Sequence, residues 1–267
     1  MKIVIPTYAR PDGQLDILEK GWIPESYYHN VYVCIRNSMT EYDRYSHLEN
    51  KVNLVPLDLP MMSGIPEKRD AICRHFAGEK IWMCDDDIKI VSTYLRDDKS
   101  YILKDKTLSE ESFYELINMA TGLLEEMPFG SVGTGYFPHN KKKHPIALNR
   151  WGAFNSFINL GKLTADDLGY TRVKYYEDIA AWLSAIDKGY NNFSLFKWLL
   201  IIGKEKDGGN VAARNEETME EASKVLHSLY PDHIKLQDKA RDKKNNRRVY
   251  LKVMPKGVPK NLVDIDK

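Results

Sequence analysis

Short apolar runs alternate with amphipathic stretches along the first 90 residues of the chain. The β-branched and aromatic runs predict strands at residues 2–7, 31–35, 53–57 and 80–84. The stretches between them predict helices at residues 14–21, 41–49 and 66–76. Strands that alternate with helices indicate right-handed crossovers and a mostly parallel sheet flanked by helices, which is an α/β fold.

A second set of elements follows with a different rhythm. Ser109 is the expected N-cap of an amphipathic helix that runs to about residue 127. Further strands are predicted at residues 130–137, 151–160 and 193–202, and further helices at 177–189 and 216–229. The chain shows no internal repeat and no low-complexity linker. We therefore expect one domain, with a core at residues 1–215 and a C-terminal helical and basic extension at 216–267 packed on it.

Composition narrows the class of protein. A hydrophobic content of 43% is that of a folded globular chain rather than a disordered one. Three separated cysteines without a Cys-x-x-Cys pair argue against a disulfide framework or a zinc site, so we expect reduced thiols in the core of a cytoplasmic protein. The N-terminus leads directly into a strand, which leaves no room for a signal peptide, and the longest apolar stretch is too short to span a bilayer.

Three consecutive aspartates, Asp85, Asp86 and Asp87, close the apolar run of residues 80–84. Adjacent carboxylates repel and raise one another's pKa, so a cation or a ring of hydrogen-bond donors usually accompanies them. Magnesium and manganese take oxygen ligands and often share them between one or two carboxylates and substrate phosphates. In an open α/β sheet, ligands bind beyond the carboxyl ends of the strands. The triplet therefore indicates a metal–diphosphate site, with an exposed acidic turn as the alternative.

Other motifs stand in a fixed order around this acidic triplet. The segment Ile-Pro-Thr-Tyr-Ala-Arg-Pro at residues 5–11 ends the first strand, and Gly-Ile-Pro-Glu-Lys-Arg-Asp at residues 64–70 opens the helix before the acidic strand. A Tyr-Glu-Asp motif at residues 176–178 follows the triplet by about ninety residues. Over residues 1–210 this ordered set resembles the GT-A class of nucleotide-sugar glycosyltransferases, whose fold is Rossmann-like and whose aspartate cluster is called the DxD motif.

The resemblance implies that the triplet holds a nucleotide sugar and its metal. Asp85 or Asp86 would meet the ribose of the nucleoside. Asp87, with Asp85 beside it, would bind a divalent Mn²⁺ or Mg²⁺ ion that bridges the diphosphate. This chemistry is reasonable because breaking a sugar–phosphate bond builds negative charge on the departing diphosphate, which a metal neutralises as a Lewis acid.

The same resemblance assigns nucleotide contacts to the other motifs. Arg69 would lie against the nucleotide and add a charge-assisted contact. The alternative for Arg69 is a surface salt bridge with Glu67 or Asp70. Three residues would belong to the base-binding turn of the class, namely Pro6, Thr7 and Arg10.

The motif at residues 176–178 is the second acidic centre. An acceptor hydroxyl needs an aligned base when it attacks, and a carboxylate is sufficient. In GT-A enzymes that invert the anomeric centre, an aspartate in such a pair is the base, so the resemblance favours Asp178 over Glu177. If the configuration is retained, no base is required and the pair would only orient the acceptor. Acids in the first turn of a helix are also ordinary capping residues.

Two basic segments complete the pattern. The loop at residues 138–145 carries three lysines and two histidines, and it would grip a phosphate backbone, close over the donor or simply be solvated. Residues 235–256 hold nine basic residues against two aspartates, in a chain whose net charge is only +1. Concentrated positive charge indicates a polyanionic partner, with a solvated surface as the alternative. We select Lys243, Lys244, Arg247 and Arg248 as candidate DNA-binding residues.

The C-terminal quarter of the chain is similar to a narrower branch of the class. Asp-Gly-Gly-Asn at residues 207–210, a helix that ends in Leu-Tyr-Pro at 229–231, and the basic segment that closes in Val-Tyr-Leu-Lys-Val at 249–253 resemble the phage-type and TET/JBP-associated DNA base glycosyltransferases. The resemblance implies transfer of a sugar, with glucose expected, from a UDP-sugar to a 5-hydroxymethylpyrimidine such as 5-hydroxymethylcytosine in double-stranded DNA. For a bacteriophage enzyme this would occur in the cytoplasm of the infected cell, without a membrane or protein partner.

Two other functions remain open from the sequence. One keeps the glycosyl transfer but uses a glycan or protein acceptor. The other is a non-catalytic nucleic-acid-binding module on a transferase fold. The sequence leaves four points unanswered: the sugar, the stereochemical course, whether the acceptor base already carries a sugar, and the oligomeric state.

Overall fold

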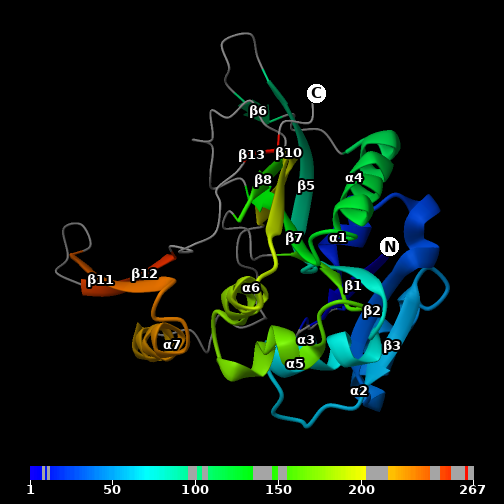
Figure 1. Ribbon diagram of the computed structural model, residues 1–267. Coiled ribbons are helices and arrows are strands. Elements are labelled where there is room, and N and C mark those ends of the chain that lie inside the picture. Colours follow the sequence, from blue (N-terminus) through cyan, green and yellow to red (C-terminus); the bar gives the residue numbers. More distant parts are fainter. Residues whose placement is uncertain are drawn as a thin grey trace.

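Four parallel strands form the N-terminal half of a large sheet, in the order β3–β2–β1–β4 (Figure 1). They are β1 (Lys2–Pro6), β2 (Val31–Arg36), β3 (Asn53–Leu57) and β4 (Lys80–Met83). The computed structural model describes residues 1–7, 10, 13–95, 101–103, 108–134, 146–149, 155–202, 216–240, 247–253 and 262–263. Because parallel strands end at the same edge, the segments that follow these four strands are brought together.

The other half of the sheet is mixed. Its strands are β5 (Ile88–Leu95), β6 (Tyr101–Leu103), β7 (Phe129–Thr134), β8 (Ile146–Leu148), β9 (Ser156–Asn159), β10 (Asn192–Ile202) and β13 (Leu262–Val263). Strand β9 lies between β4 and β7 and is antiparallel to both. Strand β10 is parallel to β7 and antiparallel to β5 and β8. The α/β class is confirmed, and antiparallel strands extend the parallel half.

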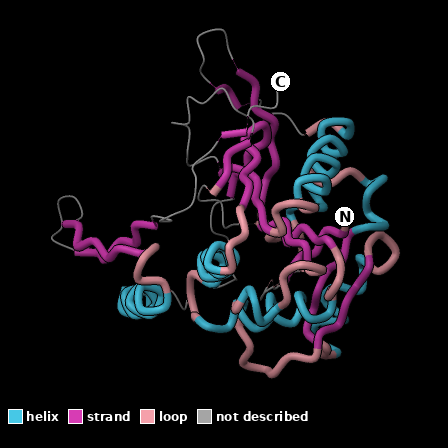
Figure 2. The backbone as a smooth tube through the Cα atoms, viewed as in Figure 1, coloured by secondary structure: helices cyan, strands magenta, loops and turns pink. Residues whose placement is uncertain are grey.

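Helices cover both faces of the sheet (Figures 1 and 2). One face carries α1 (Asp16–Glu19), α2 (Met39–Tyr45) and α4 (Glu110–Leu123). The other carries α3 (Ile65–His75), α5 (Ala165–Leu168) and α6 (Glu177–Asp187). Short 3-10 turns are found at Glu25–Asn30, Ser46–Leu48 and Tyr170–Arg172. The C-terminal extension adds α7 (Glu216–Leu229), which packs beside α6, and a separate ribbon of β11 (Ile234–Ala240) and β12 (Arg247–Val253).

The central strands are buried on both sides. In β1, Ile3 and Ile5 belong to one hydrophobic cluster and Val4 belongs to the other. In β4, Trp82 joins the first cluster and Ile81 the second. Full burial of such a side chain contributes about 1.5–3 kcal/mol each. This two-sided burial explains why these strands are continuous apolar runs rather than alternating ones.

Most elements predicted from the sequence are confirmed, with shifted ends. The predicted helix at 14–21 is shorter because Gly21 has a φ of +64°, which stops the helix. Ser109 caps α4, since its hydroxyl accepts from the backbone N–H of Ser112. The basic tail contains the two strands β11 and β12, which its hydrophobic pattern does not predict. The polar loop at 138–145 and the break at 207–210 lie outside the described residues.

The three cysteines are reduced, as the sequence predicts. Cys34, Cys73 and Cys84 are all free and buried. Burial raises the pKa of each thiol, which keeps it protonated. Among the helices of the described ranges, none is long and apolar enough to cross a bilayer.

Candidate active site

The aspartates occupy the junction between β4 and β5 rather than a long loop. Strand β4 ends at Met83, and β5 begins at Ile88 and pairs with β10. The backbone N–H of Cys84 donates to the carbonyl of Val4 on β1, and the carbonyl of Asp86 accepts from the N–H of Ile17 at 3.0 Å. The three carboxylates are therefore held on a rigid backbone at the carboxyl edge of the parallel strands, where the sequence placed them.

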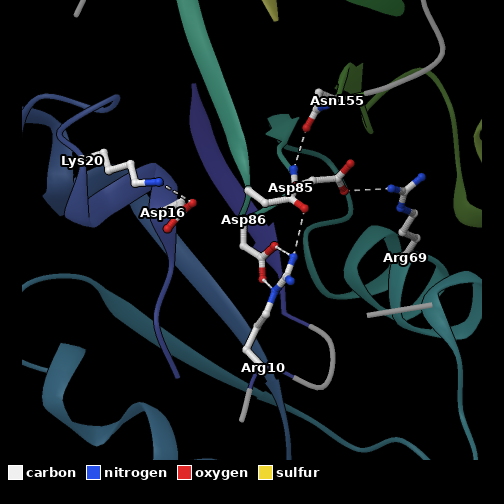
Figure 3. A network of polar contacts seen from close by, with 8 residues as sticks. Arg10, Asp16, Lys20, Arg69, Asp85, Asp86 and Asn155 are labelled. Carbon is white, nitrogen blue, oxygen red and sulfur yellow. Dashed lines mark hydrogen bonds and ion pairs between the residues drawn. The ribbon is translucent and has the colours of Figure 1, made fainter. Parts of the chain in front are cut away.

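Arg10, from the segment after β1, binds two of the three acids, and Figure 3 shows its pair with Asp86. Its Nε and Nη2 atoms meet the two Asp86 oxygens at 2.8 and 2.5 Å, and Nη2 also lies 3.1 Å from an oxygen of Asp87. The hydrogen bond to Asp86 raises the pKa of Arg10. Burial raises the pKa of Asp86 although Arg10 opposes this. Asp86 therefore anchors Arg10, and an exposed acidic turn does not describe it.

Arg69 on α3 binds the remaining acid of the triplet and the second acidic centre together. Its Nη2 is 3.0 Å from Asp85 Oδ1, and its Nη1 is 3.2 Å from Glu177 Oε1. Burial disfavours the Arg69 charge, but the carboxylates of Asp85, Glu177 and Asp178 outweigh this and raise its pKa. The alternative of a surface pair with Glu67 or Asp70 is wrong, because Arg69 is buried.

The second acidic centre begins α6 and is also buried. Tyr176 precedes it with a φ of +64°, a left-handed conformation that turns the chain sharply into the helix. Asp178 accepts from the N–H of Ile179 at 2.8 Å. Burial first, and then the charge of Glu177, raise the pKa of Asp178. Asp178 is thus held beside Arg69 in the first turn, and Glu177 makes the direct ion pair.

Asn155 supports the triplet from the position just before β9, the strand that pairs with β4. Its backbone carbonyl accepts from the indole of Trp82 at 3.1 Å. The Oδ1 atom of Asn155 accepts from the backbone N–H of Asp85 at 2.5 Å (Figure 3). Because a backbone N–H can only donate, this bond fixes which amide atom is the oxygen. The Nδ2 atom is then buried without a partner among the described residues, as is Nε of Arg69. Both are hydrogen-bond donors at the rim of the acidic cluster.

The residues of the expected base-binding turn lie on the same edge. Pro6 is the last residue of β1, and Thr7 is almost fully buried. The Thr7 hydroxyl donates to the carbonyl of Cys34 at 2.9 Å. The backbone carbonyl of Thr7 accepts a hydrogen bond from Nζ of Lys68. Burial lowers the pKa of Lys68. Lys68 therefore fixes the turn and places a buried cation behind it.

The acids fit an oxygen-loving cation that takes further ligands from a substrate. Asp85 and Asp87 side chains are 35% and 24% exposed, whereas Asp86 is 6% exposed and bound to Arg10. Burial, followed by the charge of Asp85, raises the pKa of Asp87, which a cation would reverse. In the described part of the chain, no group of three His, Cys, Asp or Glu could enclose a metal. Two carboxylates suit Mg²⁺ or Mn²⁺ completed by diphosphate and water.

Two of the candidate DNA-binding residues lie on the C-terminal ribbon, which stands apart from the main sheet (Figure 1). Arg247 and Arg248 begin strand β12 of the C-terminal ribbon. Lys243 and Lys244 lie outside the described residues. The sequence does not point to Asn155 or Lys68, because an isolated asparagine or a helical lysine carries no recognisable motif. The sequence indicates Glu177 as a site residue but not its ion pair with Arg69, which fixes the position of the Glu177 carboxylate.

Comparison with known proteins identifies the family. No protein-family model matches the chain. The chain is 30% identical over 248 residues to the beta-glucosyl-HMC-alpha-glucosyl-transferase of Enterobacteria phage T2, covering 88% of this chain and 83% of that protein. The chain belongs to this family of glucosyltransferases. The family member from Enterobacteria phage T6 is 29% identical over the same length and coverage.

Solved structures agree on the fold. The S. aureus TarS 1–349 structure in complex with UDP-GlcNAc superposes with a TM-score of 0.54 at 15% identity, covering 86% of this chain and 66% of that one. Glucosyl-3-phosphoglycerate synthase from Mycobacterium tuberculosis, in complex with Mn²⁺, UDP and glucosyl-3-phosphoglycerate, gives 0.50 at 10% identity, covering 95% and 86%. The family member is thus a glycosyltransferase of the GT-A fold, as the sequence indicated.

Proposed function

We propose that this protein transfers glucose from UDP-glucose, in α linkage, to a glucose already attached to hydroxymethylcytosine in DNA. The names of the phage relatives describe an alpha-glucosyl transfer to beta-glucosyl-HMC. The observation that carries the proposal is the acidic cluster at the carboxyl edge of the parallel sheet, flanked by Arg10 and Arg69. The sequence left open whether the acceptor base already carries a sugar, and the relatives favour a glucosylated base.

Asp87 and Asp85 would hold a Mn²⁺ or Mg²⁺ ion, which when bound neutralises charge on the diphosphate. Arg69 already touches Asp85, and its buried Nε has no partner in the described part of the chain. The Nδ2 of Asn155 is a second such donor. A UDP-sugar supplies phosphate, ribose and sugar oxygens that accept hydrogen bonds, so the donor would satisfy both atoms.

The α linkage bears on the second acidic centre. The glucose of UDP-glucose is α-configured, so an α-linked product means that the anomeric configuration is retained. A retaining transfer does not require a base aligned for inversion. We therefore propose that Glu177 and Asp178 act on the acceptor side by orientation and by positioning Arg69. The alternative role of Asp178 as a base belongs to an inverting course.

We propose DNA as the polymer that carries the acceptor, with the basic C-terminal extension as its contact. Residues 235–256 concentrate positive charge in an otherwise nearly neutral chain, which matches a polyphosphate backbone. Since both relatives are from phages, we place the reaction in the cytoplasm of an infected cell. The intact acids favour an enzyme over a non-catalytic binding module.

The test is direct. Duplexes that contain either hydroxymethylcytosine or its β-glucosyl derivative are incubated with UDP-glucose and Mn²⁺, and the released nucleosides are weighed by mass spectrometry. We expect a second hexose on the glucosylated base, and NMR of the product should show an α linkage. Transfer only to unglucosylated hydroxymethylcytosine would move the acceptor to the base hydroxyl. A β-linked product would restore inversion and the base role of Asp178, and no transfer to either duplex would refute the proposal.

A further inference from the structure

The C-terminal extension contains a two-stranded antiparallel ribbon that stands apart from the main sheet (Figures 1 and 2). Its strands β11 and β12 pair in continuous register, from Ile234 opposite Val253 to Ala240 opposite Arg247. Helix α7 packs against both strands. The extension is therefore a small helix-backed ribbon rather than an irregular basic tail.

The base of the ribbon is fixed to the helix that carries the second acidic centre. The Tyr230 hydroxyl, after α7, lies 2.6 Å from the hydroxyl of Ser184 and donates to the carbonyl of Ala180 at 3.2 Å, both on α6. His233 Nε2 lies 2.7 Å from Asp187 at the end of α6. Helix α6 thus holds Glu177 at one end and the ribbon at the other, so the ribbon has a defined place relative to the active site.

The register divides the ribbon into two chemically different faces. Residues at alternate positions of a strand share a face, and directly paired residues share it too. One face is formed by positions Lys235, Gln237, Lys239, Arg248, Tyr250 and Lys252. The other is formed by Ile234, Leu236, Asp238, Ala240, Arg247, Val249, Leu251 and Val253. The first has four cations and no acid, whereas the second is mostly apolar.

Burial at the start of β11 shows how these faces are turned. Ile234 is fully buried and belongs to the cluster that contains Leu226 and Tyr230 of the α7 region. Lys235, the next residue and the first of the cationic positions, is exposed. Leu236, the next position on the face of Ile234, is 36% exposed, so the contact with the α7 region is made at the base of the ribbon. There Ile234 is turned toward α7, and Lys235 lies on the opposite, cationic face.

Resting on the proposed function, we propose that this ribbon enters the major groove of the acceptor DNA with its cationic face toward the duplex. The major groove, about 12 Å wide, admits a two-stranded β-ribbon, whose strands are only about 4.8 Å apart. Cations on one face of such a ribbon meet the phosphates that line the groove. Substituents on C5 of a pyrimidine project into the same groove, as the thymine methyl does. The ribbon thus enters the groove that displays the acceptor sugar.

Adjacent arginines on opposite faces provide the decisive comparison. Arg248 is on the cationic face, directly opposite Lys239, whereas Arg247 is on the other face. We expect Arg248→Gln and Lys239→Gln each to lower the slope of log affinity against log salt by about 0.9, measured by fluorescence anisotropy with a short duplex. The sequence selects Arg247 as a DNA contact together with Arg248, but the register puts Arg247 at a position of the other face, so the proposal keeps only Arg248 of the two. Arg247→Gln removes the same charge and should leave the slope near that of the wild type. Equal losses at both arginines would overturn the assignment of faces, and no loss at either would overturn the DNA contact.

The choice of groove has its own readout. Dimethyl sulfate methylates guanine N7, which lies in the major groove, and adenine N3, which lies in the minor groove. Binding of the wild-type protein should protect guanine N7 and leave adenine N3 reactive, and Arg248→Gln should weaken this protection. Protection of adenine N3 with guanine N7 still reactive would overturn the proposal. If Arg248→Gln fails to fold, as judged by circular dichroism, Lys239→Gln at the paired position gives the same test.

These measurements are separate from the glucosyl transfer itself. Binding slopes and methylation protection need neither UDP-glucose nor a glucosylated base, so they decide the ribbon even if no transfer is found. Conversely, transfer to a β-glucosyl-hydroxymethyldeoxycytidine nucleoside would support the proposed function even if the ribbon left guanine N7 reactive.

Discussion

Replacement of Asn155 by glycine should separate the positioning of Asp85 from the stability of the fold. Asn155 has a φ of +55° and is 3% exposed, and its Oδ1 holds the backbone N–H of Asp85. Glycine adopts this backbone conformation without strain but lacks the side chain that reaches Asp85. The substitution therefore removes the support of one proposed metal ligand while it leaves the turn into β9 intact.

The magnitudes follow from these contacts. Loss of the hydrogen bond costs about 1 kcal/mol, or up to about 3 kcal/mol if the Asp85 N–H finds no other partner. Glycine adopts the left-handed conformation of position 155 without strain, which stabilises the folded state by about 1 kcal/mol. We therefore expect Asn155→Gly to change the free energy of unfolding by less than about 2 kcal/mol. Asn155→Ala lacks this stabilisation and should cost more. Loss of a residue that orients a metal ligand typically lowers metal affinity or activity about 10–100-fold.

The assay compares two positions of the same kind. Asn149 has a φ of +50°, is also 3% exposed, and its Oδ1 accepts from the N–H of Asn192 at 2.8 Å. It directly follows β8 and is hydrogen-bonded to Asn192 at the start of β10, at the end of the sheet opposite the aspartates. Urea unfolding should show similar small effects for Asn149→Gly and Asn155→Gly. Calorimetry of Mn²⁺-dependent UDP-glucose binding, and the transfer rate, should fall only for Asn155→Gly.

Two results would refute this reasoning. Wild-type donor binding and transfer in Asn155→Gly would show that Asp85 needs no support from Asn155. An equal functional loss in Asn149→Gly would show that the effect is a general loosening of the sheet rather than displacement of Asp85.

Other predictions concern the acids. Asp87→Asn should abolish Mn²⁺-dependent UDP-glucose binding in calorimetry, as a chelator should in the wild type, and full activity in either case would exclude the metal assignment. Glu177→Gln leaves Arg69 with one fewer carboxylate and should lower kcat about 10–100-fold with little change in Mn²⁺ affinity; a loss confined to Mn²⁺ binding would contradict this role. Burial and Glu177 raise the pKa of Asp178 to about 7, so the folded state binds this proton more tightly and stability falls as pH rises from about 4 to about 7. Asp178→Asn should flatten that fall in urea unfolding at a series of pH values, and an unchanged pH dependence would assign it to another group.

The sequence by itself determined the elements and the chemistry they carry. Short apolar runs that alternate with amphipathic stretches predicted a mostly parallel sheet flanked by helices. The apolar runs are continuous because a strand covered by helices on both sides needs no polar face. The position of Asp85–Asp87 after such a run placed the acids at the carboxyl edge of the sheet. These features are local, since they depend on residues that are neighbours in the chain.

Only the tertiary structure decided which charges meet. Arg10 and Asp86 are 76 residues apart in sequence, and no local pattern pairs them. The same holds for Arg69 and Glu177, and for the bond from Asp85 to Asn155, across 70 residues. These contacts depend on strand order and register, which bring distant segments to one edge of the sheet. Register likewise placed Arg247 and Arg248 on opposite faces of a ribbon, where the sequence showed only a run of positive charge.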